Sequence, residues 1–220
     1  MKYRPALNSF RGVPGTHAKL LSAMKLALKY SAARRVETGT ILLKQNAVEL
    51  GRIAEWAGAA RLDGAIFYAL NPRGRSWQEL MPDASGAAAA VDELTRLKRL
   101  GVRVNNSFGH LARMKAHYAA PTAESAPAFC LAAVTARIRH DGDVYVCPFT
   151  PPVGNVRAGG FWKVWDSAAA RAAREKAAFC GKPCGSHSCH FQPGLLERIW
   201  EFAKRTPSAA RPYSKKPLRI

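Results

Sequence analysis

The hydrophobic positions in the first 70 residues switch between helical and strand-like spacing. Five apolar side chains recur at helical intervals near the N-terminus: Leu20, Leu21, Met24, Ala27 and Leu28. They predict a helix with Thr16 as its N-cap. A strand is predicted at residues 36–43, and a helix follows from Asn46, which with Glu49 resembles a capping box. Residues 64–70 are almost continuously apolar, as in a strand buried in a parallel sheet. The helix–strand–helix–strand order predicts an α/β fold.

The middle of the chain predicts loops and two more helices. Residues 71–87 are rich in glycine and proline and are expected to form a loop. A helix is predicted at residues 88–100, where Gly101 can terminate it, and a shorter one at 111–118. We expect one domain over residues 1–115, a second over 116–205, and a disordered basic tail over 206–220.

The pattern after Cys130 predicts a small α+β domain. Strands at residues 134–138 and 144–146 flank Asp141-Gly142, a dipeptide typical of hairpin turns. Ser167 is expected to cap the second of three helices, which are predicted at residues 161–165, 168–178 and 195–204.

Composition excludes several classes of protein. The chain has 220 residues, of which 48% are hydrophobic, so it can bury a core and is not predicted to be disordered. It contains no apolar run of the ~18 residues that a membrane helix needs, and residues 1–10 lack the apolar region of a signal peptide. We therefore expect a cytoplasmic protein without a membrane partner, whose thiols stay reduced.

The net charge is strongly positive: the chain contains 34 Lys and Arg residues and 15 Asp and Glu residues, which gives +19. Such a charge can indicate a nucleic-acid-binding protein. Here the cations are spread over many predicted helices, and only residues 204–219 form a concentrated basic stretch. Because no platform of aromatic and basic residues accompanies the charge, a nucleic-acid partner is not expected.

The candidate metal ligands are five cysteines, all in the last 91 residues: Cys130, Cys147, Cys180, Cys184 and Cys189. One pair brackets the predicted hairpin, and the other three lie in a loop rich in Gly, Pro and His. An odd number of thiols in a reducing compartment favours metal ligands over disulfides. An iron–sulfur cluster is favoured; zinc remains open, since His187 and His190 lie close by, although the C-x2-C spacing of many zinc sites is lacking.

Several motifs carry a family resemblance. The cysteine region reads C-x11-G-x4-C from Cys130 to Cys147 around Gly142, then Gly-Asn-Val-Arg at residues 154–157 and F-x3-W at 161–165. In this order they resemble the SPASM, or twitch, domain that holds an auxiliary cluster in radical S-adenosylmethionine proteins. Segments of the first half resemble the end of the barrel of that family: Arg-Gly-Val-Pro-Gly-Thr-His at 11–17, Thr-Ile-Leu-Leu-Lys-Gln-Asn at 40–46 and Asn-Pro-Arg-Gly-Arg at 71–75.

The resemblance implies a partial (β/α) barrel, comprising its last two strands with their helices, followed by the auxiliary domain with one 4Fe–4S cluster. It implies Cys130, Cys147, Cys180 and Cys184 as ligands, with Cys189 free or replacing Cys180. The sequence contains no C-x3-C-x2-C, the motif whose cluster cleaves S-adenosylmethionine in the family. We therefore expect the C-terminal part of such a protein, which would use S-adenosylmethionine only if another polypeptide supplied the missing half. Whether the chain is itself an enzyme stays open.

In complete relatives such a domain supports the radical modification of a peptide or a cofactor precursor, so a peptide or small-molecule substrate is implied. Two alternatives remain: a standalone iron–sulfur electron-transfer protein, and a basic zinc-dependent nucleic-acid-binding protein.

Other residues are weaker candidates. The resemblance places Lys44, Gln45 and Asn71 at the strand ends, where relatives bind substrate and S-adenosylmethionine; capping and turn roles are the simpler interpretation. His17, His110 and His117 are expected on helix surfaces, and Trp162 and Trp165 over the cluster loop.

Overall fold

A computed structural model describes residues 12–30, 35–71, 77–123 and 130–178, together with Cys180, Leu195, Leu196 and Ile199. Its first part contains, in chain order, α2 (Thr16–Tyr30), β1 (Glu37–Ile41), η1 (Ala47–Glu49), α3 (Leu50–Ala59), β2 (Gly64–Tyr68), α4 (Trp77–Leu80), α5 (Ala84–Arg99) and α6 (Phe108–Ala119). The predicted α/β order is confirmed. None of the described helices combines the length and the apolar character required to span a bilayer.

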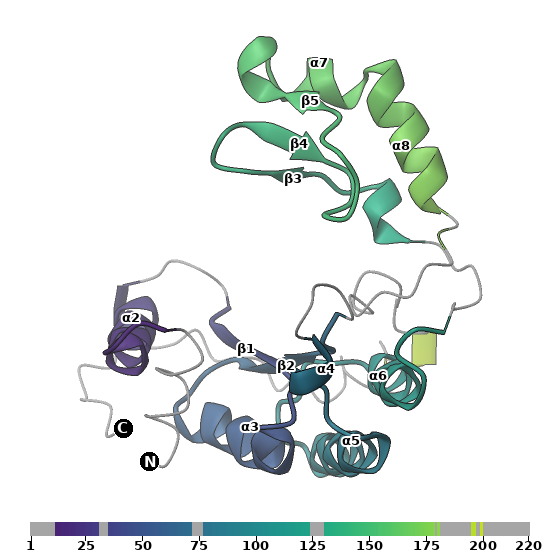
Figure 1. Cartoon of the computed structure of the whole chain (residues 1–220). Helices are drawn as coiled ribbons and strands as arrows, with labels where there is room; N and C mark the ends of the chain where they lie inside the picture. The colour runs from purple at the N-terminus through teal and green to yellow at the C-terminus, as the bar shows by residue number, and fades with distance from the viewer. Residues whose placement is uncertain are drawn as a thin grey trace.

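The sheet of the first part is parallel. β1 pairs with β2 in register, from Glu37 opposite Gly64 to Ile41 opposite Tyr68. A third parallel position follows on the other side of β2, where Val104 forms a bridge with Ala65. The three positions therefore run in chain order, and α3 and α5, which connect them, both lie below the sheet in Figure 1. The bridge at Val104 was not predicted.

Side chains of β2 alternate between two faces. Ala65 and Phe67 are fully buried in a core with helices α3 and α5, to which Leu50 and Leu94 also belong. On the opposite face Ile66 and Tyr68 are half-buried. Ile41, opposite Tyr68 on β1, is 44% exposed. The helices thus cover one face of the sheet, and the other face retains exposed apolar surface.

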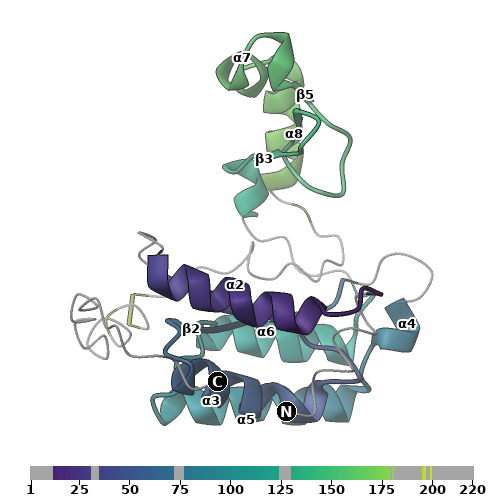
Figure 2. The same ribbon diagram turned by 90° about the vertical axis from the view of Figure 1, so that its left-hand side faces the viewer.

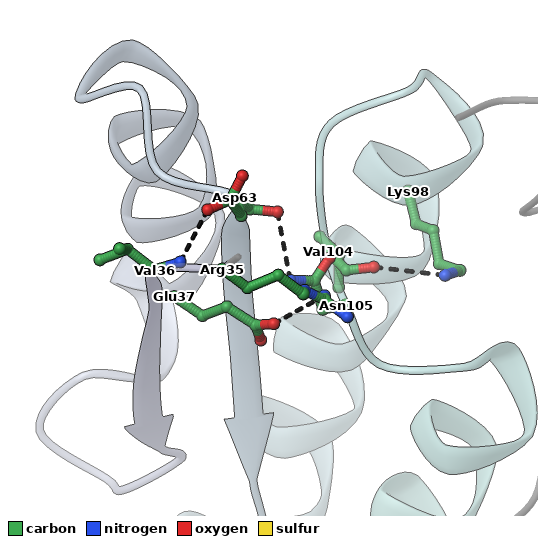
Figure 3. Close-up of polar contacts among 7 residues, drawn as sticks. All are labelled: Arg35, Val36, Glu37, Asp63, Lys98, Val104 and Asn105. Atoms are coloured by element: carbon green, nitrogen blue, oxygen red, sulfur yellow. Dashed lines mark hydrogen bonds and ion pairs between the residues drawn. The ribbon is translucent and has the colours of Figure 1, made fainter. Parts of the chain in front are cut away.

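Polar contacts fix the amino ends of the three strand positions (Figure 3). The Val36 N–H donates to Asp63 Oδ2 at 2.7 Å, and Asn105 Nδ2 donates to the Asp63 carbonyl at 3.3 Å. Lys98, which is only 5% exposed, donates from Nζ to the Val104 carbonyl at 3.2 Å. One acidic residue thereby links both neighbours of β2.

The second part is a small α+β unit, as predicted. It contains η2 (Leu131–Ala133), β3 (Arg137–Ile138), β4 (Asp143–Tyr145), β5 (Gly154–Asn155), η3 (Val156–Ala158), α7 (Phe161–Trp165) and α8 (Ala168–Ala178). The three strands form an antiparallel sheet in the order β3-β4-β5, and Figure 2 shows α7 and α8 beside it. The predicted hairpin is confirmed, whereas β5 was not predicted. Of the helix predicted at 195–204, only Leu195, Leu196 and Ile199 lie within the described residues, and they are helical.

Two of the predicted caps are wrong. Thr16 is the first residue of α2, and its hydroxyl donates backwards to the Val13 carbonyl at 2.7 Å. Asn46 makes no side-chain cap; its amide instead bridges the Leu43 N–H and the Ile41 carbonyl beyond the end of β1. Ser167 does cap α8, since its Oγ accepts from the Ala170 N–H at 3.1 Å.

Helices α5 and α6 begin earlier than predicted. Asp83 accepts from the Gly86 N–H at 2.7 Å and caps α5, so this helix includes part of the predicted loop. Ser107 accepts from the His110 N–H at 3.0 Å and caps α6. Both are side chains with a strong preference for N-caps.

Candidate metal centre

Cys130 lies at the start of the second part and is 6% exposed. Its N–H donates to the Ala178 carbonyl at 3.0 Å, and its carbonyl accepts from the Ala133 N–H at 2.9 Å. Because Ala178 is the last residue of α8, this bond brings residues 48 positions apart together. Cys130 is therefore fixed against the carboxyl end of α8.

Cys180 follows that same helix end. Its N–H donates to the Ala177 carbonyl at 3.3 Å, one residue before the carbonyl that Cys130 uses. Cys180 is partly buried. The two cysteines thus bond to consecutive carbonyls of the last turn of α8, so their backbones are neighbours in space.

Cys147 belongs to a different segment and lies two residues after the end of β4. Its carbonyl accepts from both the N–H and the hydroxyl of Thr150, at 3.1 and 2.9 Å. The Cys147 side chain is partly buried and packs against the small core of the second part. That core consists of Cys130, Ala132, Val146 and Ala177, with Val153, Trp165 and Ala173 at its edge. We call this packed group of side chains, including Cys147, the cysteine pocket.

The Asp141-Gly142 turn sets the position of β4 and hence of Cys147. Gly142 has a φ of +90°, which favours glycine, and a Cβ at this position would lie 2.7 Å from Asn155 Oδ1. Asn155 Nδ2 donates to the Asp141 carbonyl at 3.1 Å and to the Asp143 carboxylate at 2.9 Å. The asparagine of the Gly-Asn-Val-Arg motif therefore holds the hairpin turn against β5.

The chemistry of this pocket fits a thiolate-bound cluster. The side chains around the two cysteines are apolar, and sulfur donors in apolar surroundings are what iron–sulfur clusters use. Within the described residues no three His, Cys, Asp or Glu side chains form a group that could hold a metal ion. Cys184, Cys189, His187 and His190 lie outside the described residues. The structure thus brings Cys130 and Cys147 into one apolar cluster, and the Cys180 backbone hydrogen bonds to Ala177 of that cluster.

The two tryptophans of α7 have different surroundings. Trp165 packs at the edge of the cysteine pocket. The loop over which both tryptophans are predicted to pack lies largely outside the described residues. Trp162 is 70% exposed. Phe161 lies between them, stacked on Trp165 at a centroid distance of 5.8 Å and edge-on to Trp162 at 5.1 Å.

The carboxyl ends of β1 and β2 form a second polar region. Lys44 and Gln45 are exposed there, while Asn71 is half-buried. Tyr118 of α6 joins the two strand ends, since its hydroxyl donates to the Leu42 carbonyl at 2.6 Å and accepts from the Leu70 N–H at 2.8 Å. Burial raises the pKa of the Tyr118 phenol, so it stays protonated.

The prediction that His110 and His117 lie on a helix surface is wrong. They are 5% and 7% exposed, because α6 turns this face toward β2. His117 Nε2 lies 2.8 Å from the Leu70 carbonyl, and burial lowers the pKa of this histidine. His110 Nδ1 lies 3.0 Å from Asn106 Nδ2, and burial lowers the His110 pKa to about 4. His17 is half-buried in the first turn of α2.

Comparison with protein-family models gives a match to the SPASM family, described as an iron–sulfur cluster-binding domain, over residues 130–190. The matched segment contains all five cysteines of the chain. Comparison with curated proteins found no match, and neither did comparison with solved structures.

Proposed function

Because the C-terminal part of this chain carries a SPASM iron–sulfur cluster-binding domain, we propose that the protein holds one auxiliary 4Fe–4S cluster in support of a radical reaction. The cluster would store or pass single electrons. The substrate class we propose is a peptide or a cofactor precursor. S-adenosylmethionine would bind only in a completed barrel.

The observation that carries this proposal is the convergence of two distant segments on one apolar pocket. Cys130 is fixed by the end of α8, and Cys147 reaches the same pocket from β4. As thiolates, cysteines buried together in this way would need a metal centre to compensate their charge, and a cluster would supply it. We propose Cys130, Cys147, Cys180 and Cys184 as ligands, with Cys189 as the alternative to Cys180.

The experiment is anaerobic purification followed by analysis of iron, sulfide and zinc and by a visible spectrum. We expect about four irons and four sulfides per chain. Cys147→Ala should lose most of the iron, because it removes a proposed ligand. Thr150→Ala is the matched control, since it removes one bond to the Cys147 carbonyl and leaves the thiol in place.

The outcome separates the alternatives. Stoichiometric zinc without sulfide would contradict the proposal and favour the zinc-dependent protein, in which case binding to nucleic acid should weaken steeply with salt. A cluster that cycles reversibly, in a chain that associates with no other polypeptide, would favour the standalone electron-transfer protein.

We further propose that the first part is the end of a (β/α) barrel and takes additional strands from another polypeptide. Two features support this. The helices α3 and α5 lie on one face of the sheet while the strand positions advance in one direction, as in barrels, whereas doubly wound sheets carry helices on both faces. The opposite face exposes Ile41, and among the described residues β1 pairs only with β2. An open parallel edge of this kind tends to recruit a further strand.

Sedimentation of the chain alone tests this second proposal. We expect concentration-dependent association that Ile41→Lys weakens, because a charge on the open face disfavours packing against it. Val48→Lys is the matched control, since Val48 is 88% exposed outside the sheet. A monomer that unfolds cooperatively at every concentration would contradict the need for a partner.

A further inference from the structure

Arg174 of α8 is held against the cysteine pocket. Its guanidinium carbon lies 4.1 Å from the centre of the Trp165 ring, in a cation–π contact. Its Nη1 also donates to the Trp165 carbonyl at 2.6 Å. The side chain is half-buried. Two contacts to one residue thus fix the position of this cation.

Trp165 connects this cation to the cysteines. The indole packs at the edge of the core that contains Cys130, while Phe161 stacks on it with an interplanar angle of 19°. Ala173 and Ala177, on the same helix as Arg174, belong to the same pocket. The guanidinium is therefore one side chain, Trp165, away from the apolar cluster that contains Cys130.

The positive charge of Arg174 is not neutralised by a carboxylate in the part of the chain that the structure describes; the ion pairs found there involve other arginines and a lysine. A half-buried cation acts on nearby charges through a lower effective dielectric than water provides. One-electron reduction makes a bound cluster more negative by one charge. With a cluster held at Cys130 and Cys147, a cation fixed on Trp165 would stabilise the reduced state and raise the reduction potential.

We propose that Arg174 is a redox-tuning residue, which acts through its fixed place on Trp165 to raise the reduction potential of the cluster in the cysteine pocket. This inference rests on the proposed function. Arg174 is a positioning residue in this role, since it ligates no iron.

The test compares reduction potentials by anaerobic redox titration of the full chain, followed by electron paramagnetic resonance. Arg174→Gln removes the charge and keeps a planar donor, so its potential should shift to a more negative value at unchanged iron content. Arg174→Lys keeps the charge and should retain most of the wild-type potential. Arg171→Gln is the matched control, because Arg171 is exposed on the same helix and should leave the potential unchanged.

An unchanged potential in Arg174→Gln, or an equal shift in Arg171→Gln, would overturn the inference. If Arg174→Gln holds no cluster, Arg174→Met replaces it, since it keeps the packing on Trp165 without the charge. If the wild-type chain binds no cluster, both this inference and the proposed function are wrong. A cluster whose reduction potential is the same in Arg174→Gln as in the wild type contradicts this inference and leaves the proposed function standing.

Discussion

Asn106 and Phe67 exchange two hydrogen bonds, side chain to backbone. The Phe67 N–H donates to Asn106 Oδ1 at 2.8 Å, and Asn106 Nδ2 donates to the Phe67 carbonyl at 2.6 Å. The asparagine amide thus takes the place of a strand residue and extends the pairing of β2 beyond the bridge at Val104. A backbone that would otherwise be unpaired and buried is satisfied by one side chain.

Asn106→Ala should therefore destabilise the first part. It leaves both Phe67 backbone groups buried without partners, and the expected cost is roughly 2–4 kcal/mol in the free energy of unfolding. Urea unfolding followed by circular dichroism measures it. Asn105→Ala, which loses one 3.3 Å bond to the Asp63 carbonyl, should cost less than half as much. Equal costs would show that the extension of β2 contributes nothing specific.

Tyr118→Phe should weaken the link between the two strand ends. Removal of the hydroxyl leaves the Leu42 carbonyl and the Leu70 N–H without this partner, so a loss of about 1–3 kcal/mol is expected. The control is Tyr30→Phe, whose ring is 62% exposed and which should change stability by less than about 0.5 kcal/mol. If hydrogen exchange at the amide of Leu70 is no faster in Tyr118→Phe, this role of the hydroxyl is wrong.

Stability should fall as the pH is lowered from about 6.5 to about 4. Burial lowers the pKa of His110 from 6.5 to about 4, so in this window the unfolded chain binds a proton that the folded chain does not. The contribution of His110 to stability is complete above the higher pKa and is lost toward the lower one, on the order of 3 kcal/mol in total. The lowered pKa of His117 acts in the same direction.

Urea unfolding at several pH values measures this loss. His110→Gln should flatten the dependence, because an amide does not titrate; the contribution of His117 remains. His140→Gln, at an exposed position on the hairpin, is the control. Identical pH slopes in His110→Gln and the wild type would rule out His110 as the source.

Gly154→Ala should disturb the second part and its metal content. Gly154 has a φ of +155°, and a Cβ there would lie 2.8 Å from Val164 Cγ1, so β5 would have to move away from α7. We expect a loss of roughly 1–3 kcal/mol and a lower iron content, since β5 braces the turn that positions Cys147. Gly58→Ala is the control, because nothing lies within 4 Å of the new Cβ and alanine favours the helix. Unchanged iron in Gly154→Ala would show that this contact does not matter for the site.

Local chemistry explains which elements the sequence predicts well. The bounds of α7 and α8 and the cap at Ser167 agree with the structure, because turn and cap preferences depend on a few neighbouring residues. The hairpin at Asp141-Gly142 agrees for the same reason.

Tertiary contacts explain the elements that the sequence does not predict. The bridge at Val104 forms only because β2 lies beside it. Asn106 pairs with Phe67 of β2, which is 39 residues earlier in the chain. His110 is polar and yet buried, because α6 turns this face toward β2. Hydrophobic periodicity contains neither signal.

In the candidate site, too, local features are predictable from the sequence and long-range contacts are not. The spacing of Cys130, Gly142 and Cys147 predicts a shared pocket, because a tight hairpin returns the chain on itself. The bond from Cys130 to the end of α8 has no local signature, since it joins backbone atoms.

That bond has a consequence for how the second part is connected. The chain enters at Cys130 and leaves at Cys180, and both residues hydrogen bond to the last turn of α8. Among the described residues, Cys130 and Cys180 therefore lie next to each other although they are 50 positions apart, and closely spaced ends are typical of units that can be inserted into a host chain with little disturbance.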